Sequence, residues 1–243
     1  MTTPDMPPQD PQPTGPALPG WAPRPYPDPV PLQGRFVRLE KLDVTQHADA
    51  LLDAYAADPE GRLWTYLFAE KPTDRAAFHN WVAKTSSTED PLVYAIVDQA
   101  SGRAVGVESF MRIDRANGVI EIGGINFSRQ LQHTSGATEA IFLLMRRAFD
   151  ELGYRRFEWK CDSLNAPSRR AALRLGFQFE GIFRQHVIYK GRSRDTAWYA
   201  IIDSDWPAIK AAFVAWLQPD NFDASGVQRH SLARLRAQHL PAG

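Results

Sequence analysis

A short polar turn that runs into an amphipathic helix is the feature that most restricts how this chain folds. The residues concerned are Gln132, His133, Thr134, Ser135, Gly136, Ala137 and Thr138. Small side chains leave the backbone N–H groups of such a turn uncovered, and the helix dipole adds about half a positive charge at the same point. The turn therefore predicts a site for an anion such as a pyrophosphate. A plain helix start with Ser135 as its cap explains the segment equally well.

A second helix start follows about one strand later, from Asn165 to Ser168. Asn165 offers a short polar cap, and Pro167 fits the first turn of a helix. This helix is predicted to end at Gly176. For Asn165 and Ser168 taken singly, capping is a sufficient explanation, so any function has to be argued from both segments together.

Both segments, in this order and with a strand between them, resemble the GNAT superfamily of acetyl-CoA-dependent N-acetyltransferases. The closest match within it is the branch that acetylates the N-terminal alanine or serine of ribosomal proteins, whose relatives also modify other amines. The family motif is Gln or Arg, two residues, Gly, one residue, and then Gly or Ala. Gln132 and Ala137 match this motif, whereas Ser135 stands at the central Gly and Gly136 is displaced by one position.

The resemblance covers about residues 35–216 and implies the α+β GNAT fold. This fold has three layers, with a central, mixed, mostly antiparallel twisted sheet of about seven strands flanked by about four helices. Hydrophobic periodicity gives the same order of elements. The expected strands are 34–40, 92–98, 103–113, 119–128, 155–163 and two between 177 and 203, and the first helices are expected to begin near Asp43 or Thr45 and near Thr73 or Asp74.

The chain divides into three parts by composition. Residues 1–32 hold 12 of the 19 prolines and show no period, which predicts an extended or disordered arm. Residues 33–217 form the expected N-acetyltransferase domain. Residues 218–243 form a C-terminal tail, expected to be a frayed helix or disordered.

Composition excludes several classes of protein. A single cysteine rules out an internal disulfide framework, which together with the lack of a signal segment predicts a cytoplasmic protein. No apolar run is long enough to span a membrane, and a formal net charge of zero argues against a general nucleic-acid binder. Residues 146–194 nevertheless hold 12 Lys or Arg and only 5 Asp or Glu. This excess indicates either a solvated face or a basic rim around a phosphate site.

The resemblance implies where acetyl-CoA lies. Residues from Gln132 to Thr138 face its phosphates, and Asn165 and Ser168 reach toward the pantetheine and phosphate end. The pantetheine enters a gap between the strand over 119–128 and the next parallel strand. It binds there to backbone groups of Ile125, Asn126 and Phe127, which also polarise the thioester carbonyl. Trp64, Tyr66 and Phe68 lie where family members shape the acceptor pocket, and core packing of these rings is an equally open interpretation.

Two acids are candidates for a catalytic role. Glu121 stands inside an otherwise apolar strand and is either an ion-pair partner or a base that acts through water. Asp162 is the second candidate. Cys161 shares a strand face with Trp159 and is expected to be a core residue rather than a nucleophile. Many family members carry a Tyr that protonates the leaving thiolate, where this chain has Ala172.

The sequence thus predicts an enzyme that moves an acetyl group from acetyl-CoA to a primary amine by direct attack. The acceptor is a protein N-terminus or a small amine, and no metal, nucleic acid or membrane is expected to take part. A homodimer is possible. The alternative from another class is a non-catalytic acyl-CoA-binding or regulatory module of the same fold, for which the altered Gly and the missing Tyr leave room.

Overall fold

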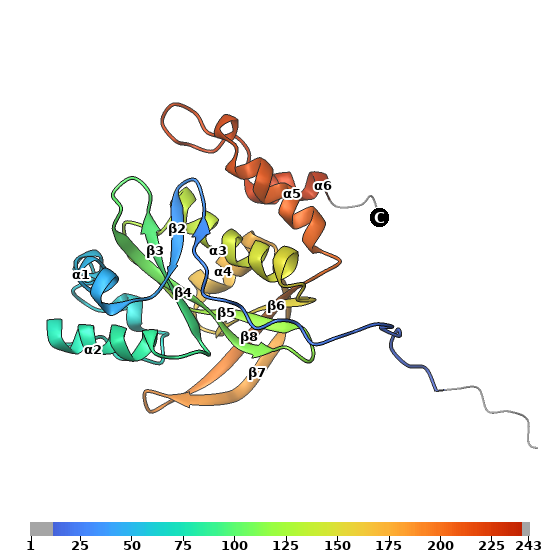
Figure 1. Cartoon of the computed structure of the whole chain (residues 1–243), viewed down its shortest axis with the longest axis horizontal. Coiled ribbons are helices and arrows are strands. Elements are labelled where there is room, and N and C mark those ends of the chain that lie inside the picture. Colours follow the sequence, from blue (N-terminus) through green and yellow to red (C-terminus); the bar gives the residue numbers. More distant parts are fainter. Residues whose placement is uncertain (1–11, 240–243) are drawn as a thin grey trace, which may run out of the picture.

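One sheet of eight strands organises the chain. The computed structural model describes residues 12–239, and within them the strands follow the order β1-β2-β3-β4-β5-β6-β8-β7 (Figure 1). Neighbouring strands are antiparallel except β5 and β6, which are parallel. The strands span Leu32–Gln33 (β1), Val37–Lys41 (β2), Leu92–Asp98 (β3), Ala104–Asp114 (β4), Val119–Phe127 (β5), Arg156–Asp162 (β6), Gln178–Tyr189 (β7) and Arg192–Ile202 (β8).

Helices cover both faces of the sheet (Figure 1). α1 and α2 bury one apolar cluster against β3 and β4, while α3, α4 and α5 bury a larger cluster against the opposite face. No helix within residues 12–239 is long and apolar enough to cross a bilayer. The helices span Val44–Tyr55 (α1), Arg62–Trp64 (η1), Arg75–Ser86 (α2), Ser135–Arg146 (α3), Arg147–Glu151 (η2, a π turn), Ala166–Leu175 (α4), Trp206–Leu217 (α5), Pro219–Asn221 (η3) and Leu232–His239 (α6).

Local signals in the sequence set several of these boundaries. Asp43 and Asp74 cap α1 and α2, because each carboxylate accepts backbone N–H groups of the first turn. Asn165 caps α4 in the same way, and Gly176 ends that helix with a φ of 104°. The expected starts and stops of these helices are therefore confirmed.

The parallel strands β5 and β6 pair only in their first halves. Ile122 and Trp159 are their last partners. Beyond this point residues 123–127 keep their pairing with β4, and residues 160–162 keep theirs with β8, so the two facing edges separate. Backbone groups on these edges are left without ladder partners and are free to bind a ligand. The gap that the resemblance implied is thus present in the structure.

A β-bulge lies where this gap opens. Between the pairs Ser109–Gly123 and Val107–Asn126, β5 advances three residues while β4 advances two. The extra residue is accommodated at Gly124, whose φ of 60° is a left-handed conformation that favours glycine. The paired glycines of the sequence therefore mark a bulge that bends β5 away from β6.

The fold class expected from the sequence is confirmed, and only the counts differ. The sheet has eight strands rather than about seven, and residues 12–239 hold six α-helices rather than about four. Two of the added elements are short, since the strand β1 has two residues and the helix α6, within the C-terminal tail, has eight. Elements this short carry too few apolar repeats to be recognised by period.

The proline-rich arm contains no helix or strand from residue 12 to 31, yet its second half lies against the domain. Trp21 Nε1 donates a hydrogen bond of 2.8 Å to the Ala116 carbonyl, and the indole ring covers Gly118. These contacts join the arm to the β4–β5 hairpin. The boundary predicted between arm and domain stays a prediction, and residues 1–11 lie outside the described residues.

The segment after α5 is also packed. Trp216 Nε1 donates a hydrogen bond of 2.6 Å to Gln228 Oε1, and α6 buries Leu232 and Leu235 against α4 and α5. The described part of the C-terminal tail thus covers one end of the α4–α5 layer. Residues 240–243 lie outside the described residues.

A buried carboxylate joins the N-terminal strands to α3. Glu139 accepts three backbone hydrogen bonds, from Arg35 at 2.7 Å, Phe36 at 2.6 Å and Val37 at 2.9 Å. Gly34 lets the turn approach this closely, since a Cβ there would lie 2.5 Å from the Glu139 carboxylate. This contact holds the turn between β1 and β2 against the helix that begins at the site.

We predict that Glu139→Ala lowers the free energy of unfolding by about 2–4 kcal/mol, because three backbone donors lose a charged acceptor. Glu139→Gln keeps one acceptor oxygen and should lose less. Urea unfolding followed by circular dichroism measures both variants. A Glu139→Ala variant within about 0.5 kcal/mol of the unsubstituted chain would contradict the prediction.

Candidate active site

A cavity of about 1100 Å³ opens between the separated halves of β5 and β6. It runs through the sheet, from the start of α3 on one face to the aromatic residues after η1 on the other. Because the parallel ladder stops early, the cavity is bounded by backbone edges in its middle and by side chains at its two ends.

The start of α3 forms the first end of the cavity. Thr134 caps this helix, with its Oγ1 accepting the Ala137 N–H at 3.2 Å. Ser135 is the first helical residue, so the alternative that placed the cap at Ser135 is wrong by one position. The first N–H groups of a helix have no acceptor within it, which suits this end to an anion. Gln132, His133, Thr134, Ser135, Ala137 and Thr138 line the cavity, whereas Gly136 faces Val37.

Two arginines of α4 stand beside this helix start, and sequence reasoning did not single them out. Arg170 and Arg174 both line the cavity, and two Arg174 nitrogens lie 3.1 Å from Thr138 Oγ1. Neither arginine forms an ion pair with the residues from 12 to 239. Because the two arginines are four residues apart on a predicted helix, the sequence did indicate that they share one basic face.

The start of α4 forms the wall next to these arginines. Asn165 Oδ1 accepts the Ser168 N–H at 3.2 Å, and Ser168 Oγ accepts Trp159 Nε1–H at 2.9 Å. All three residues line the cavity, as does Cys161. Burial raises the pKa of the Cys161 thiol, so the group stays protonated and is a weak nucleophile. Cys161 was expected to be a core residue rather than a nucleophile, and its buried position agrees with this expectation.

The part of β5 beside the gap is held in place from two directions. The Tyr55 hydroxyl in α1 donates to the Asn126 carbonyl at 2.7 Å, and Gln132 Nε2 donates to the Phe127 carbonyl at 3.0 Å. Ile125, Asn126 and Phe127 all line the cavity. The strand edge expected to bind a pantetheine is thus fixed by side chains from outside the sheet.

The second end of the cavity is aromatic. Tyr66 and Phe68 line it, and Phe68 packs against Tyr189 with ring centroids 5.6 Å apart. Trp64 does not line it. Its indole is buried against Trp81 in the core of the α1–α2 layer, with ring centroids 4.9 Å apart. The position of Trp64 therefore supports core packing rather than the predicted contact with a substrate.

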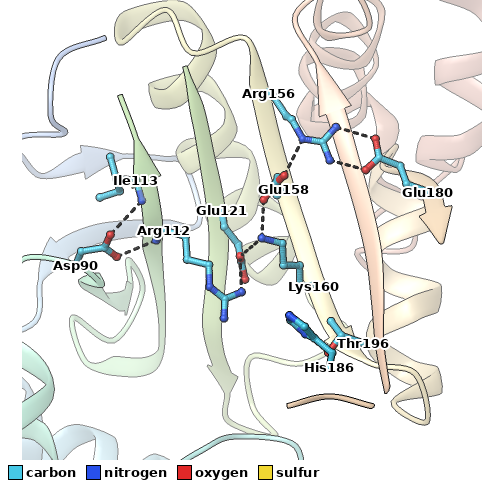
Figure 2. A network of polar contacts seen from close by, with 10 residues as sticks. All are labelled: Asp90, Arg112, Ile113, Glu121, Arg156, Glu158, Lys160, Glu180, His186 and Thr196. Carbon is cyan, nitrogen blue, oxygen red and sulfur yellow. Dashed lines mark hydrogen bonds and ion pairs between the residues drawn. The ribbon is translucent and has the colours of Figure 1, made fainter. Parts of the chain in front are cut away.

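An ion network crosses the sheet next to this second end (Figure 2). Glu121 on β5 accepts from Lys160 Nζ at 2.9 Å and from Arg112 Nη1 at 3.0 Å. Lys160 also contacts Glu158 at 2.6 Å, so it lies between two carboxylates. The side chains of Glu121 and Lys160 are only 4 and 5% exposed. Glu121 is therefore an ion-pair partner, which was one of its two interpretations.

The network continues away from the cavity. Arg156 Nε contacts Glu158 at 2.7 Å, and its guanidinium forms a two-point pair with Glu180 (Figure 2). At the opposite side the Asp90 carboxylate accepts the backbone N–H groups of Arg112 and Ile113, at 2.8 and 3.0 Å. Asp90 thereby fixes an irregular stretch of β4 from which Arg112 reaches Glu121 (Figure 2).

Glu121 keeps one oxygen outside these ion pairs. Both cations contact Oε2, while Oε1 lies near the backbone of Gly123, where the gap opens. Burial raises the pKa of Glu121, and the charges of Lys160 and Arg112 oppose this shift. A raised pKa and an oxygen beside the gap are the properties of a proton acceptor.

Asp162 ends β6 at the same gap. Its Oδ1 accepts the Leu164 N–H at 2.8 Å, and its Oδ2 accepts the Tyr189 hydroxyl at 2.8 Å. Burial, together with this hydrogen bond, raises the pKa of Tyr189 to about 12, so Tyr189 is the donor. Asp162 and Glu121 are the two predicted acids, and the structure places both on the cavity wall.

Several cavity residues carried no usable signal in the sequence. Arg112 enters the site from a backbone with a φ of 49°, in a stretch whose register is irregular. Phe222 and Gln228 line the cavity from the segment after α5, which shows no period. Lys160 was recognisable, because it alternates with Glu158 and Asp162 along one face of β6.

The chain is similar in sequence and structure to known acetyltransferases. The family model described as an acetyltransferase (GNAT) domain matches residues 37–178. A GCN5-related N-acetyltransferase from Brucella melitensis is 50% identical in sequence, with a TM-score of 0.89. That match covers 90% of this chain and 100% of the other.

More distant relatives agree with this family. An uncharacterized N-acetyltransferase p20 from Bacillus licheniformis is 29% identical over 113 residues, which is 46% of this chain and 63% of that protein. Two structures share the fold at lower identity. The first is a putative ribosomal-protein-serine acetyltransferase from Vibrio cholerae, which is 16% identical with a TM-score of 0.62 and a match that covers 71% of this chain and 97% of the other. The second is the microcin C7 self-immunity acetyltransferase MccE in complex with acetyl-CoA and AMP, which is 23% identical with a TM-score of 0.61 and a match that covers 70% of this chain and 93% of the other.

The ion network yields a prediction about stability. Lys160→Met leaves Glu121 and Glu158 buried with fewer partners, so it should lower the free energy of unfolding by about 3–5 kcal/mol. Arg103→Met breaks the exposed pair with Asp53 and should cost less than about 1 kcal/mol. Urea unfolding compares the two variants, and equal losses would show that Lys160 does not hold the network together.

Proposed function

The chain belongs to the GNAT family of acetyltransferases, and from this premise we propose that it transfers the acetyl group of acetyl-CoA to a primary amine. The observation that carries the proposal is the cavity between β5 and β6, which joins an anion-binding helix start to an acid-lined pocket on the opposite sheet face. A donor with phosphates and a thioester matches the first end and the middle, and an amine matches the second end.

The donor half is supported by charge and by backbone geometry. The helix start at Thr134 to Thr138 offers N–H groups to a pyrophosphate, and Arg170 and Arg174 add two cations beside it. The free edge of β5 offers N–H and C=O groups to a pantetheine, as a neighbouring strand would. Backbone N–H groups on this edge are also suited to stabilise negative charge on a thioester oxygen.

In the proposed reaction the neutral amine attacks the thioester carbonyl directly. The new C–N bond forms as the C–S bond breaks, and the amine loses a proton while CoA leaves as a thiolate. A thiol pKa of about 8.5 makes departure without an acid feasible, which suits a chain with the buried Ala172 where relatives carry a Tyr.

The proton of the amine requires an acceptor. Deprotonating an N-terminal amine at pH 7 costs about 1.0–1.4 kcal/mol, against about 4.6 kcal/mol for a lysine amine. We assign this role to Glu121 acting through a water molecule, because its Oε1 is free of ion pairs and lies beside the gap. Asp162, at the end of β6, is the second acid that reaches the amine from the same sheet face.

The function is tested by acetyl-CoA turnover against a panel of peptides and small primary amines, with free thiol as the readout. Thiol release that depends on an amine, with the acetylated amine identified by mass spectrometry, is the expected result. Binding of CoA without turnover of any amine would favour the non-catalytic acyl-CoA-binding module instead. Absence of CoA binding at millimolar concentration would overturn both.

We predict that Arg174→Gln weakens CoA binding about 10–100-fold, because a charged hydrogen bond contributes about 1.5–3 kcal/mol. Isothermal titration calorimetry measures the dissociation constant. Arg184→Gln removes the same charge from an exposed position on β7, outside the cavity, and should change the constant less than about twofold. Equal effects in the two variants would mean that Arg174 acts only through overall charge.

Glu121→Gln should lower turnover by about 10²–10⁴-fold with CoA affinity retained. The base works only when deprotonated, so the rate of the unsubstituted chain should fall as pH drops through the raised pKa of Glu121. The variant should lack this acidic limb. Glu180→Gln, at the outer end of the network, should keep it. A folded Glu121→Gln variant with unchanged turnover at every pH would transfer the role to Asp162.

A further inference from the structure

Two charged side chains on the acceptor face remain outside the ion network. The network pairs three cations with three carboxylates and is therefore neutral. Asp162 and Arg194 both line the cavity, and neither has an oppositely charged side chain within 4.0 Å among the residues from 12 to 239. The acceptor end of the cavity thus presents one unpaired carboxylate and one unpaired guanidinium, whereas Arg170 and Arg174 lie at the opposite end.

Arg194 is held rigidly although it lacks an ion pair. The residue is only 7% exposed, and its Nε donates to Thr196 Oγ1 at 3.1 Å. Its Cζ lies 5.5 Å from the ring centroid of Phe68 and 5.8 Å from that of Tyr189. These contacts use Nε and the faces of the guanidinium, and leave both terminal nitrogens without a hydrogen-bond partner among the described residues.

Thr196 is itself fixed from the other side. Its Oγ1 lies 3.0 Å from His186 Nδ1 (Figure 2). Burial and the neighbouring cations Arg112, Arg194 and Lys160 lower the pKa of His186, which keeps the ring neutral. In the neutral tautomer with its proton on Nε2, Nδ1 accepts the Thr196 hydroxyl proton, and in either neutral tautomer the hydroxyl oxygen can accept from Arg194. The orientation of Arg194 is therefore set before any ligand arrives.

Asp162 and Arg194 face the same part of the pocket. Asp162 on β6 is paired with Thr196 on β8, and Arg194 lies two residues before Thr196 on that strand, on the same face and roughly 7 Å from it. Tyr189 touches both, since its hydroxyl donates to Asp162 and its ring packs near the Arg194 guanidinium. A ligand that reaches the gap at Asp162 can therefore extend toward Arg194.

We propose that the acceptor is a small amine that also carries a carboxylate, and that Arg194 binds this carboxylate while the amine lies beside Asp162. A buried guanidinium with two free terminal nitrogens is suited to two-point binding of a carboxylate. A peptide N-terminus offers a neutral amide at the corresponding position and leaves Arg194 unpaired. The inference rests on the proposed acetyl transfer and narrows its acceptor to amino-acid-like molecules.

The test compares matched pairs of acceptors. α-Amino acids, β-alanine and γ-aminobutyrate are each assayed against the corresponding amide, and phosphoethanolamine against ethanolamine. We expect the kcat/KM of the best free acid to exceed that of its amide at least tenfold. If phosphoethanolamine is preferred over ethanolamine by a larger factor than any acid over its amide, Arg194 binds a phosphate, and the inference of a carboxylate acceptor is overturned. Amides used as well as acids would also overturn the inference while leaving acetyl transfer intact.

Variants connect the preference to Arg194. Arg194→Gln should lower the acid-to-amide ratio at least tenfold relative to the unsubstituted chain, and Arg194→Lys should lower it less. Arg192→Gln removes the same charge from an exposed position two residues away and should keep the full ratio. Taking the ratio within each variant cancels differences in the folded fraction, and comparing the ratio between variants at one pH cancels the difference in amine basicity between acid and amide. A ratio unchanged in Arg194→Gln would show that another group selects the acid.

A binding measurement separates this inference from the proposed function. Titration calorimetry on the CoA-saturated protein, with the same acids and amides as probes, requires no turnover. Tighter binding of acids that is lost in Arg194→Gln would establish the carboxylate site even if no amine were acetylated. Equal binding of acids and amides, or no binding of either, would overturn it.

Discussion

The early end of the parallel ladder between β5 and β6 is the constraint on which the site depends. Pairing stops at Ile122 and Trp159, and the bulge at Gly124 turns β5 away from its neighbour. Had the two strands paired along their whole length, their backbone groups would satisfy each other and no cavity would cross the sheet. The position of the bulge thus decides both where the sheet opens and which residues face the opening.

Opening a sheet in its middle carries an energetic cost that the surroundings offset. The part of β5 beside the gap is held by the Tyr55 hydroxyl from α1 and by Gln132 from the loop before α3. Across the sheet, Glu121 and Lys160 join the two strands through side chains just beside the point where their backbones separate. Burying such a pair is expensive, and it is kept where each charge has several partners, as here.

The sequence predicted the donor half of the site better than the acceptor half. The helix starts at Thr134 and Asn165 were visible because caps and small residues act locally and leave a pattern in consecutive positions. Arg194 and Arg112 were not, because their roles arise from strand pairing and from an irregular backbone that no local pattern encodes. For Trp64 the resemblance implied an acceptor pocket and core packing was equally open, and the buried ring against Trp81 is part of the core.

The alternation of side chains along β6 explains why the two halves of the cavity receive different chemical groups. Trp159 and Cys161 face the α3–α4 layer, where the proposed donor binds, and Lys160 and Asp162 face the opposite side. In the proposed reaction, one strand therefore supplies an apolar wall to the pantetheine and charged groups to the amine. Shifting the register of β6 by one residue would exchange these faces. The Asp162 carboxylate would then face the sulfur of the proposed donor, and the unreactive Cys161 thiol would face the amine. The chemistry of the site is thus tied to the register between β6 and β8, which pairs Asp162 with Thr196 and so brings Arg194 to the same pocket.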